Sequence, residues 1–291
     1  MQGLLPYIIN GISAGGQYAL IAIGYTLVYG ILRLINFAHG DVFMVAGLIM
    51  VYASASMPMY IALPLVIVAT ALLGFLIERA AYKPLRTAPR MSLMISAIGV
   101  SYLIQNLAFY ITGGQPQPVT HPIPWISDTI SVLGASTKRV TLVTPVLTIG
   151  LVLLLVWLTK KTKVGLAMRA ASKDFETAQL MGVKINSVIS FAFVIGSALA
   201  AVGAMLYFTN YPNVAIGSGS MPGLKAFVAA VFGGIGSIPG AVVGAFIIGL
   251  CEELIKAIQP TFSDAFTFVI LIVVLCVKPT GLFGEKVTDK V

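Results

Sequence analysis

The sequence has little charge for its length. Only 10% of its 291 residues are Asp, Glu, Lys or Arg, whereas 58% are hydrophobic, and the mean hydropathy is +0.97. Polar side chains this scarce cannot cover a water-soluble globule of that length. The composition therefore excludes a soluble globular protein and indicates a chain that is solvated largely by lipid.

Several catalytic patterns are missing. The two cysteines, Cys251 and Cys276, lack metal-ligand spacing and a polar setting, so we expect inert packing residues. The chain has neither H-E-x-x-H nor G-x-x-x-x-G-K-[ST], so any ATP must bind another chain. Gly11-Ile-Ser-Ala-Gly15 fits a nucleophile elbow but lies in an apolar helix, and His39 and His121 are the only histidines. We expect no catalytic residue, metal site or cofactor on this chain.

Long apolar blocks dominate what is present. A spanning helix needs roughly 20 apolar residues to cross about 30 Å of hydrocarbon. Blocks of that order lie near residues 6–31, 41–57, 59–77, 91–112, 141–159, 186–209, 223–257 and 263–277. The seventh is long enough for two short segments, and the runs are too long for barrel strands. The sequence predicts an all-α polytopic bundle of eight or nine crossings in one domain, residues 1–291, whose first helix is retained because no basic region precedes it.

Two basic segments give an orientation. The loop from Glu78 to Arg90 has four basic residues against one acidic residue, and the stretch from Lys160 to Lys184 has six against two. By the positive-inside rule both are cytoplasmic, which also explains the net charge of +8 without nucleic acid. The segment 113–139 between them is rich in Gly, Pro, Thr and Ser and carries Trp125, which favours the opposite side.

Counting crossings extends this orientation to both ends of the chain. It places the N-terminus outside, and the link around Arg33 on the cytoplasmic side or within a membrane break. The tail favours a cytoplasmic C-terminus through Lys278, Lys286 and Lys290 against Glu285 and Asp289. That outcome requires the 223–257 block to cross twice or re-enter, so we expect a break at Gly233–Gly240.

Small residues surround that expected break. Gly236, Gly240 and Gly244 are spaced i, i+4 and i+8, as on one helix face that lets another backbone approach. The alternative is a broken helix lining a transport path, for which Gly234, Gly236 and Pro239 are the candidates. A second small-residue face indicates packing only and comprises Gly196, Ala200 and Ala204.

A polar cluster interrupts the apolar chain between Arg33 and Asp41. Charged groups at the bilayer centre cost on the order of 3 kcal/mol or more each. The cluster is therefore either an interfacial turn in which Arg33 and Asp41 are solvated, or a discontinuity in which Asn36 and His39 face a pathway.

Polar stripes with helical spacing occur in two of the apolar blocks. They comprise Asn10, Ser13 and Gln17 in the first block, and Ser92, Ser96, Gly99 and Asn106 in the fourth. Such stripes either bond neighbouring helices or line a path for a small solute, with Gln17, Ser96 and Asn106 as candidates. Neither stripe is charged. An ion-coupled carrier or channel remains the alternative function, with Asp41, Glu252 or Glu253 as its coupling carboxylate.

The segment 160–185 also has the pattern of a short helix. Ser172 is a candidate N-cap, Asp174 and Glu176 complement the positive helix end, and Gly182 before Lys184 is a stop signal. A helix of about nine residues is marginal in water by itself. One face of this helix carries Phe175, Gly182 and either Ala178 or Gln179. The segment is either a linker on anionic headgroups or a docking element.

A family resemblance bears on that choice. Glu176-Thr-Ala-Gln-Leu-Met-Gly182 resembles the E-A-A-x-x-x-G signature of bacterial ABC importer permeases, although Thr177 replaces an alanine and the downstream I-x-L-P is absent. Three further motifs are similar to those of branched-chain amino acid permeases of the LIV system, most closely its H-type subunits. They are Ile35–Asp41, Gly165–Ala171 and Lys225–Gly240.

The resemblance implies an ATP-driven importer of leucine, isoleucine or valine in a bacterial inner membrane. It implies a homologous second permease subunit, two cytoplasmic ATPases that bind the ATP, and a periplasmic amino-acid-binding protein. The residues that it marks for ATPase coupling are Arg169, Phe175, Glu176, Ala178 and Gly182.

Overall fold

The computed structural model describes residues 3–86, 88–120, 123, 125–132, 135–278 and 280–284. His121 and the tail residues 285–291, on which part of the predicted C-terminal orientation depends, lie outside them. The long helices are α1 (Leu5–Leu32), α2 (His39–Ser56), α3 (Met59–Ile77), α4 (Arg90–Thr112), α5 (Arg139–Lys161), α8 (Ile185–Asn210), α10 (Ile238–Ile258) and α11 (Ser263–Val277).

Shorter elements connect these helices. A π-helical turn, η1 (Glu78–Tyr82), extends α3, and a 3-10 turn, η2 (Pro260–Phe262), precedes α11. The remaining helices are α6 (Lys163–Lys173), α7 (Phe175–Leu180) and α9 (Ser220–Gly233). The antiparallel strand pairs are β1 (Gln117–Pro118) with β4 (Asn213–Val214), and β2 (Thr129–Val132) with β3 (Ala135–Lys138).

Eight helical segments in the described chain are long and apolar enough to cross a membrane, which confirms the predicted polytopic helical bundle. The predicted break is also confirmed, because α9 ends at Gly233 and α10 begins at Ile238. With 14 residues, α9 is about 21 Å long and too short to span. The expected three-glycine face is wrong in one position, because Gly236 lies in the break with φ of 98° rather than on a helix.

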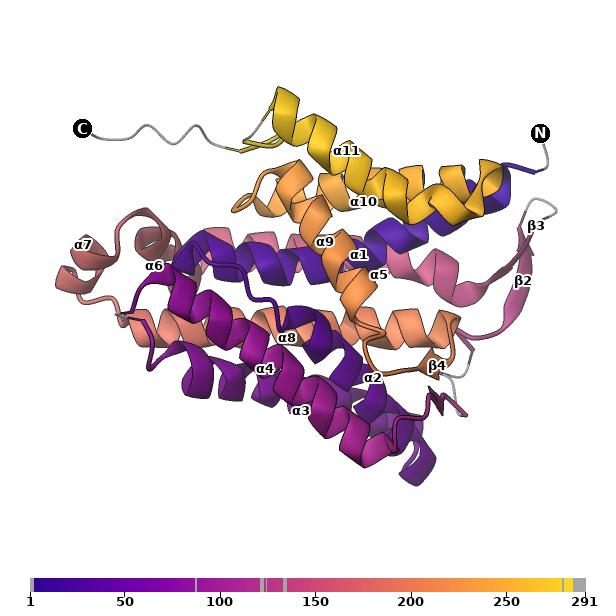
Figure 1. The fold of residues 1–291 in the computed structure, drawn as a ribbon, viewed down its shortest axis with the longest axis horizontal. Helices are drawn as coiled ribbons and strands as arrows, with labels where there is room; N and C mark the ends of the chain where they lie inside the picture. Colours follow the sequence, from indigo (N-terminus) through magenta and orange to yellow (C-terminus); the bar gives the residue numbers. More distant parts are fainter. Residues whose placement is uncertain are drawn as a thin grey trace.

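The bundle is built around α1, which is buried along most of its length and packs against α5, α8, α9 and α10 (Figure 1). Small residues allow this approach. A Cβ at Gly196 of α8 would lie 3.1 Å from the Cα of Gly24 in α1, and Ala200 and Ala204 are fully buried. The second small-residue face is therefore a packing face, as predicted.

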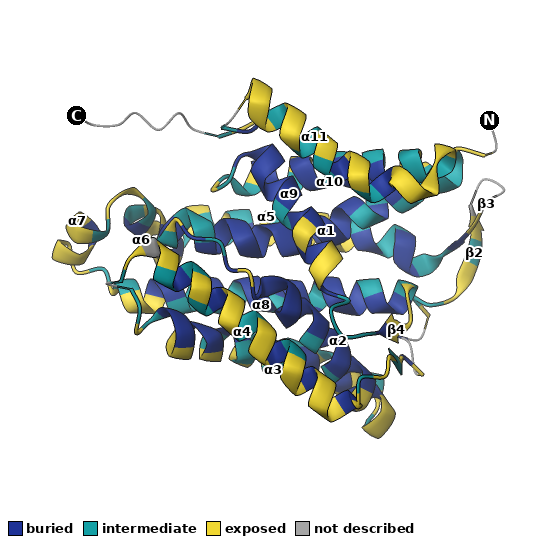
Figure 2. Ribbon diagram, viewed as in Figure 1, coloured by how far each residue is buried: buried dark blue, intermediate teal, exposed yellow. Residues whose placement is uncertain are grey.

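The outer helices expose residues along the surface that they present outward (Figure 2), and many of these side chains are apolar. Exposed side chains include Leu72 and Leu76 of α3, and Leu153 and Leu154 of α5. A surface of this kind suits lipid rather than water. The expectation that both cysteines are packing residues is wrong for Cys276, which is exposed on α11. Cys251 is partly buried.

The two segments that the charge count assigns to opposite sides lie at opposite ends of the molecule. The helices α6 and α7 are at one end, and the β2–β3 hairpin is at the other (Figure 1). Trp125, next to the hairpin, is exposed. The chain begins at the hairpin end with α1, which runs toward the α6–α7 end.

Candidate functional site

The charged segment 160–185 folds into two short helices rather than one. Thr162 caps α6 by accepting a hydrogen bond from the Gly165 N–H at 3.1 Å. Asp174 caps α7, because its Oδ1 accepts from the N–H groups of Glu176 and Thr177 at 2.9 and 3.1 Å. The prediction of Ser172 as the N-cap is wrong.

The physical reason is that the chain bends at Asp174, two positions later than Ser172. Asp174 has extended backbone angles, so its carboxylate points back at the first turn of α7, whereas Ser172 is still helical and its hydroxyl donates to the Arg169 carbonyl at 2.8 Å. The helix α7 is consequently six residues long, not nine. It ends before Gly182, whose φ of 84° is the left-handed conformation that glycine adopts without strain.

The expected docking face is turned partly inward. Ala178 is only 4% exposed, and Phe175 packs against the buried core. The surface that α7 leaves open instead carries Leu180 and Met181, which are 87% and 81% exposed, between Glu176 and Gly182. Sequence reasoning missed these two side chains. Two apolar residues directly before a glycine in a polar stretch indicate a contact surface, and this pattern could have identified them.

The segment between α1 and α2 is a true discontinuity. The helix α1 ends at Arg33, whose φ of 55° is left-handed and whose guanidinium donates to the Ser172 carbonyl at 3.5 Å. The chain then turns back into the bundle. Asn36 is 3% exposed, and its Oδ1 accepts from the Ala38 N–H at 3.1 Å and from the Tyr82 hydroxyl at 2.9 Å.

The first turn of α2 is buried as well. His39 is 2% exposed and lies against α1, with its ring centroid 4.9 Å from that of Tyr25. Asp41 is 3% exposed and accepts hydrogen bonds from Ser101 and, at 2.9 Å, from Gln105 of α4. The interpretation of a turn in which Asp41 is solvated is therefore wrong, since the carboxylate is held by neutral donors inside the protein.

Two helix starts meet inside the bundle. A Cβ at Gly219, directly before α9, would lie 1.9 Å from the Gly40 carbonyl oxygen in the first turn of α2, and one at Gly223 would lie 2.9 Å from the Gly40 Cα. The helices α2 and α9 therefore both begin where backbone touches backbone.

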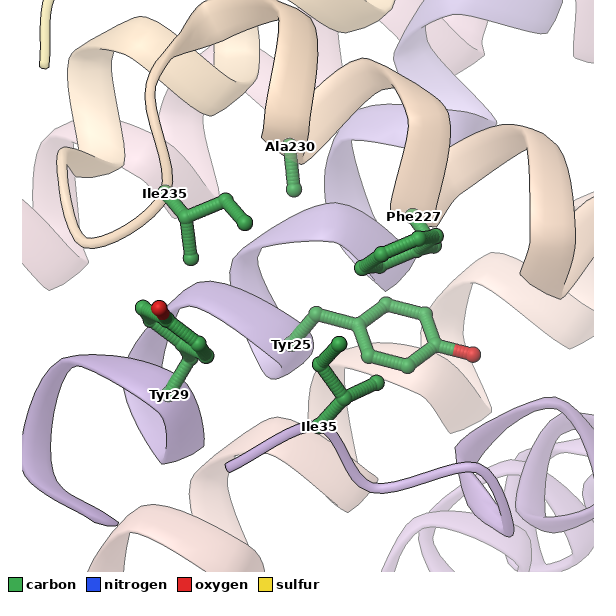
Figure 3. Close-up of a pocket in the computed structure, with 6 residues that line it drawn as sticks. All are labelled: Tyr25, Tyr29, Ile35, Phe227, Ala230 and Ile235. Atoms are coloured by element: carbon green, nitrogen blue, oxygen red, sulfur yellow. The ribbon is translucent and has the colours of Figure 1, made fainter. Parts of the chain in front are cut away.

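The two broken segments also come together. Ile35 of the 33–38 segment and Ile235 of the 234–237 break line one small cavity (Figure 3). Its other walls are Tyr25 and Tyr29 of α1, and Phe227 and Ala230 of α9. Irregular backbone at membrane depth is tolerated where protein buries it or where it lines a cavity, and this arrangement provides both.

The remaining pathway candidates do not form one site. Gln17 is buried in α1, and the Ser96 hydroxyl donates to the Ala81 carbonyl at 3.2 Å. Asn106 is exposed on α4, where its amide donates to the Tyr102 carbonyl at 2.8 Å. Pro239 lies in the first turn of α10. The structure thus brings Asn36, His39, Gly234 and Gly236 to the region where the two breaks meet, and leaves Asn106 on the outer surface.

An ion network joins α9, α10 and α11. The Lys225 ammonium lies 2.7 Å from Glu252 and 2.7 Å from Asp264, and the side chains of Lys225 and Glu252 are 8% and 1% exposed. The Tyr18 hydroxyl of α1 donates to the same Glu252 at 2.8 Å. Sequence reasoning missed Lys225 and Tyr18, because their partners are distant in the chain.

A second lysine completes the network. Lys256 is 2.7 Å from Glu252 and 2.6 Å from Glu253, one helical turn earlier in α10. Two of the three carboxylates considered for ion coupling, Glu252 and Glu253, therefore already have ammonium partners, and the third, Asp41, accepts from neutral donors. This spacing of Glu252 and Lys256, i to i+4, is visible in the sequence and is the signal that could have found the pair.

The family model described as the branched-chain amino acid transport system / permease component matches residues 7–275. The chain belongs to this family. It is 37% identical to the high-affinity branched-chain amino acid transport system permease protein BraD of Pseudomonas aeruginosa, over 99% of this chain and 98% of that protein. No solved structure matches.

Other relatives agree over nearly the whole length. The permease protein LivH of Salmonella typhimurium is 39% identical over 99% of this chain and 97% of its own. A probable LivH of Methanocaldococcus jannaschii is 30% identical over 91% of this chain and 88% of its own. The chain is thus a polytopic membrane permease component, and the alternative of an ion-coupled carrier is not supported.

Proposed function

We propose that this chain is a permease subunit that imports leucine, isoleucine and valine, driven by ATP hydrolysis on partner subunits. The observation that carries the proposal is the family match from residue 7 to residue 275, because it takes in every predicted crossing, both breaks and the α6–α7 segment. Relatives named as branched-chain amino acid permeases align with nearly the whole chain.

The proposed partners supply the functions for which this chain has no sequence motif, above all ATP binding. Its sequence has no phosphate-binding loop, so two cytoplasmic ATPases would bind the ATP, and they would dock on the α6–α7 surface through Glu176, Leu180, Met181 and Gly182. Arg169 would support this contact from α6, and Phe175 and Ala178 would fix α7 to the bundle from below. A periplasmic binding protein would deliver the amino acid at the opposite end.

The transport path would form with a homologous second permease subunit. In support, the chain has two breaks that meet at one small cavity, as expected where discontinuous helices line a transport path. Asn36, His39, Gly234 and Gly236 would lie near this passage, and Pro239 would fix the start of α10. We keep three further residues as separate pathway predictions, because they do not lie in one site: Gln17, Ser96 and Asn106.

The inner-membrane orientation gives a testable result. In a variant without native cysteines, we expect Thr129→Cys in the hairpin to react with a membrane-impermeant maleimide added to intact cells. Lys173→Cys, exposed at the end of α6, should react only after the inner membrane is opened. The positive-inside rule predicts this pattern, with the C-terminus on the α6–α7 side. The reverse labelling pattern would show that the orientation is inverted.

The coupling assignment is tested by co-purification and uptake. The detergent-extracted protein should co-purify with an ATPase, and Glu176→Arg with Gly182→Trp should abolish both that association and leucine uptake. The arginine reverses a charge at the start of α7, and the tryptophan is strained at a positive φ. A matched control, Ser131→Arg with Thr129→Trp in the exposed hairpin at the opposite end, should keep the association with the ATPase. Unchanged uptake in the α7 variant would disprove the assignment.

A further inference from the structure

A chain of polar contacts, exposed at Asn186 and buried from Glu78 onward, leads from α7 to the segment between α1 and α2. It begins where α7 joins α8, because the Val183 N–H donates to the Ala178 carbonyl at 3.0 Å and α8 starts two residues later. In the first turn of α8, the Asn186 side-chain oxygen accepts a hydrogen bond from one terminal nitrogen of Arg86. The base of α7 is thereby tied to the loop that follows η1.

Arg86 connects this contact to η1. Its other terminal nitrogen pairs with the carboxylate of Glu78, which is 0% exposed and also accepts from the Ser190 hydroxyl of α8 at 2.7 Å. A carboxylate buried this completely at the end of a spanning segment is costly unless it has a role or full compensation. Arg86 and Ser190 supply the compensation, and both reach Glu78 from elements next to α7.

The other end of η1 holds the discontinuity. Tyr82 is 1% exposed, packs on Phe193 of α8 with ring centroids 5.0 Å apart, and donates its hydroxyl to Asn36 at 2.9 Å. Asn36 in turn accepts from the Ala38 N–H just before α2. Glu78 and Tyr82 thus lie at the two ends of one five-residue turn. Glu78 contacts Arg86 and Ser190, whereas Tyr82 contacts Asn36.

The turn itself is a π-helix, as the hydrogen bond from the Lys83 N–H to the Glu78 carbonyl at 2.8 Å shows. A π turn holds one residue more than an α turn, and such turns are frequent at functional sites. A change from π to α geometry would move that extra residue out of the turn and rotate the side chains that follow by about 100°. A shift of the turn between π and α geometry would therefore provide the two arrangements that coupling between distant sites requires.

We propose that Asn186, Arg86, Glu78 and Tyr82 are positioning residues that transmit displacement of α7 to Asn36 at the membrane discontinuity. The inference rests on the proposed function, since it assumes that α7 is displaced by ATPase subunits. It adds a defined route, through η1 rather than through the Arg33–Ser172 contact, by which that displacement reaches the start of α2.

The test changes the two ends of the route and keeps Arg86 and Glu78, because removing Arg86 would take away the ion-pair partner of a buried carboxylate and unfold the site. Asn186→Leu removes the contact with Arg86 at an exposed position, and Asn186→Asp keeps an acceptor there. Tyr82→Phe removes only the hydroxyl at the other end. The control is Ser187→Leu, an exposed neighbour on the same turn.

The complete transporter with each variant is reconstituted into vesicles, and ATP hydrolysis and leucine uptake are measured in the same sample. We expect Asn186→Leu and Tyr82→Phe to keep wild-type ATP hydrolysis while uptake per ATP falls about fivefold, within the range that one member of a coupling network produces. Asn186→Asp and Ser187→Leu should keep the wild-type ratio.

Three results would overturn the route: a wild-type ratio in Asn186→Leu or Tyr82→Phe, parallel loss of hydrolysis and uptake in them, or an equal fall in Ser187→Leu. If the wild-type vesicles instead show uptake without any ATP dependence, the proposed function itself fails. The two failures are therefore distinguishable.

Discussion

Lys225→Met should leave little folded protein in the membrane. The lysine is the cation between Glu252 of α10 and Asp264 of α11, and both its own side chain and that of Glu252 are almost completely buried. Removing one partner of a buried ion pair typically costs about 3–5 kcal/mol. Because Lys256 and the Tyr18 hydroxyl still contact Glu252, we expect a cost in the lower part of that range. Since native proteins are stable by only about 5–15 kcal/mol, this is a large fraction of the total.

The measurement is the amount of monodisperse protein after detergent extraction, together with its midpoint of thermal unfolding. Lys278→Met is the matched control, because Lys278 is exposed at the end of α11 and its ammonium donates to a backbone carbonyl. Lys225→Met combined with Glu252→Gln should recover part of the loss, because it removes one of the carboxylates that are left in excess over Lys256. Equal stability of Lys225→Met and Lys278→Met would show that the network does not stabilise the bundle.

Gly249→Leu should separate the two central helices. A Cβ at this position of α10 would lie 2.3 Å from the Gly15 nitrogen, 2.6 Å from the Gly15 Cα and 2.7 Å from the Gly11 carbonyl oxygen, all backbone atoms of α1. Backbone atoms cannot rotate away as a side chain can. Overpacking of a well-packed core costs about 1–3 kcal/mol and occasionally more, and a leucine here adds four carbons with no space for the first.

Gly99→Leu is the control for that substitution. Nothing lies within 4 Å of a Cβ built on Gly99 of α4, so the same side chain meets open space there. We expect Gly249→Leu to lower the midpoint of thermal unfolding and the extracted yield, and Gly99→Leu to change neither beyond the cost of replacing one exposed helix residue. If both variants unfold at the same temperature, close contact of α1 with α10 is not what holds the centre together.

Much of the fold could be predicted because its dominant signal is local. An uninterrupted apolar run predicts a crossing by length alone, and the Gly-Pro composition of Gly233–Gly240 predicted the break between α9 and α10. Periodicity failed at Gly236, since spacing can place a glycine on a helix face only if the helix continues. A glycine can either pack on a helix face or end the helix. Tertiary contacts, which a single sequence does not show, decide between the two.

The candidate site was less predictable for the same reason. Ser172 and Asp174 are both good caps, and the choice between them depended on where the chain turns between α6 and α7. The contact of Tyr18 with Glu252 joins positions 234 residues apart, so no local pattern reveals it. Asp41 was predicted as a polar interruption, but its partners Ser101 and Gln105 lie on a different helix.

The position of α1 at the centre of the bundle has a consequence for biosynthesis. This helix is made first, yet α10, which covers its glycine face, begins at Ile238. At a synthesis rate of about 5–20 residues per second, roughly 10–40 s pass between completion of α1 and the appearance of α10. During that time the Tyr18 hydroxyl, which later donates to Glu252 of α10, lacks that partner. The nascent chain must therefore keep its first helix in a sheltered environment until the seventh crossing arrives.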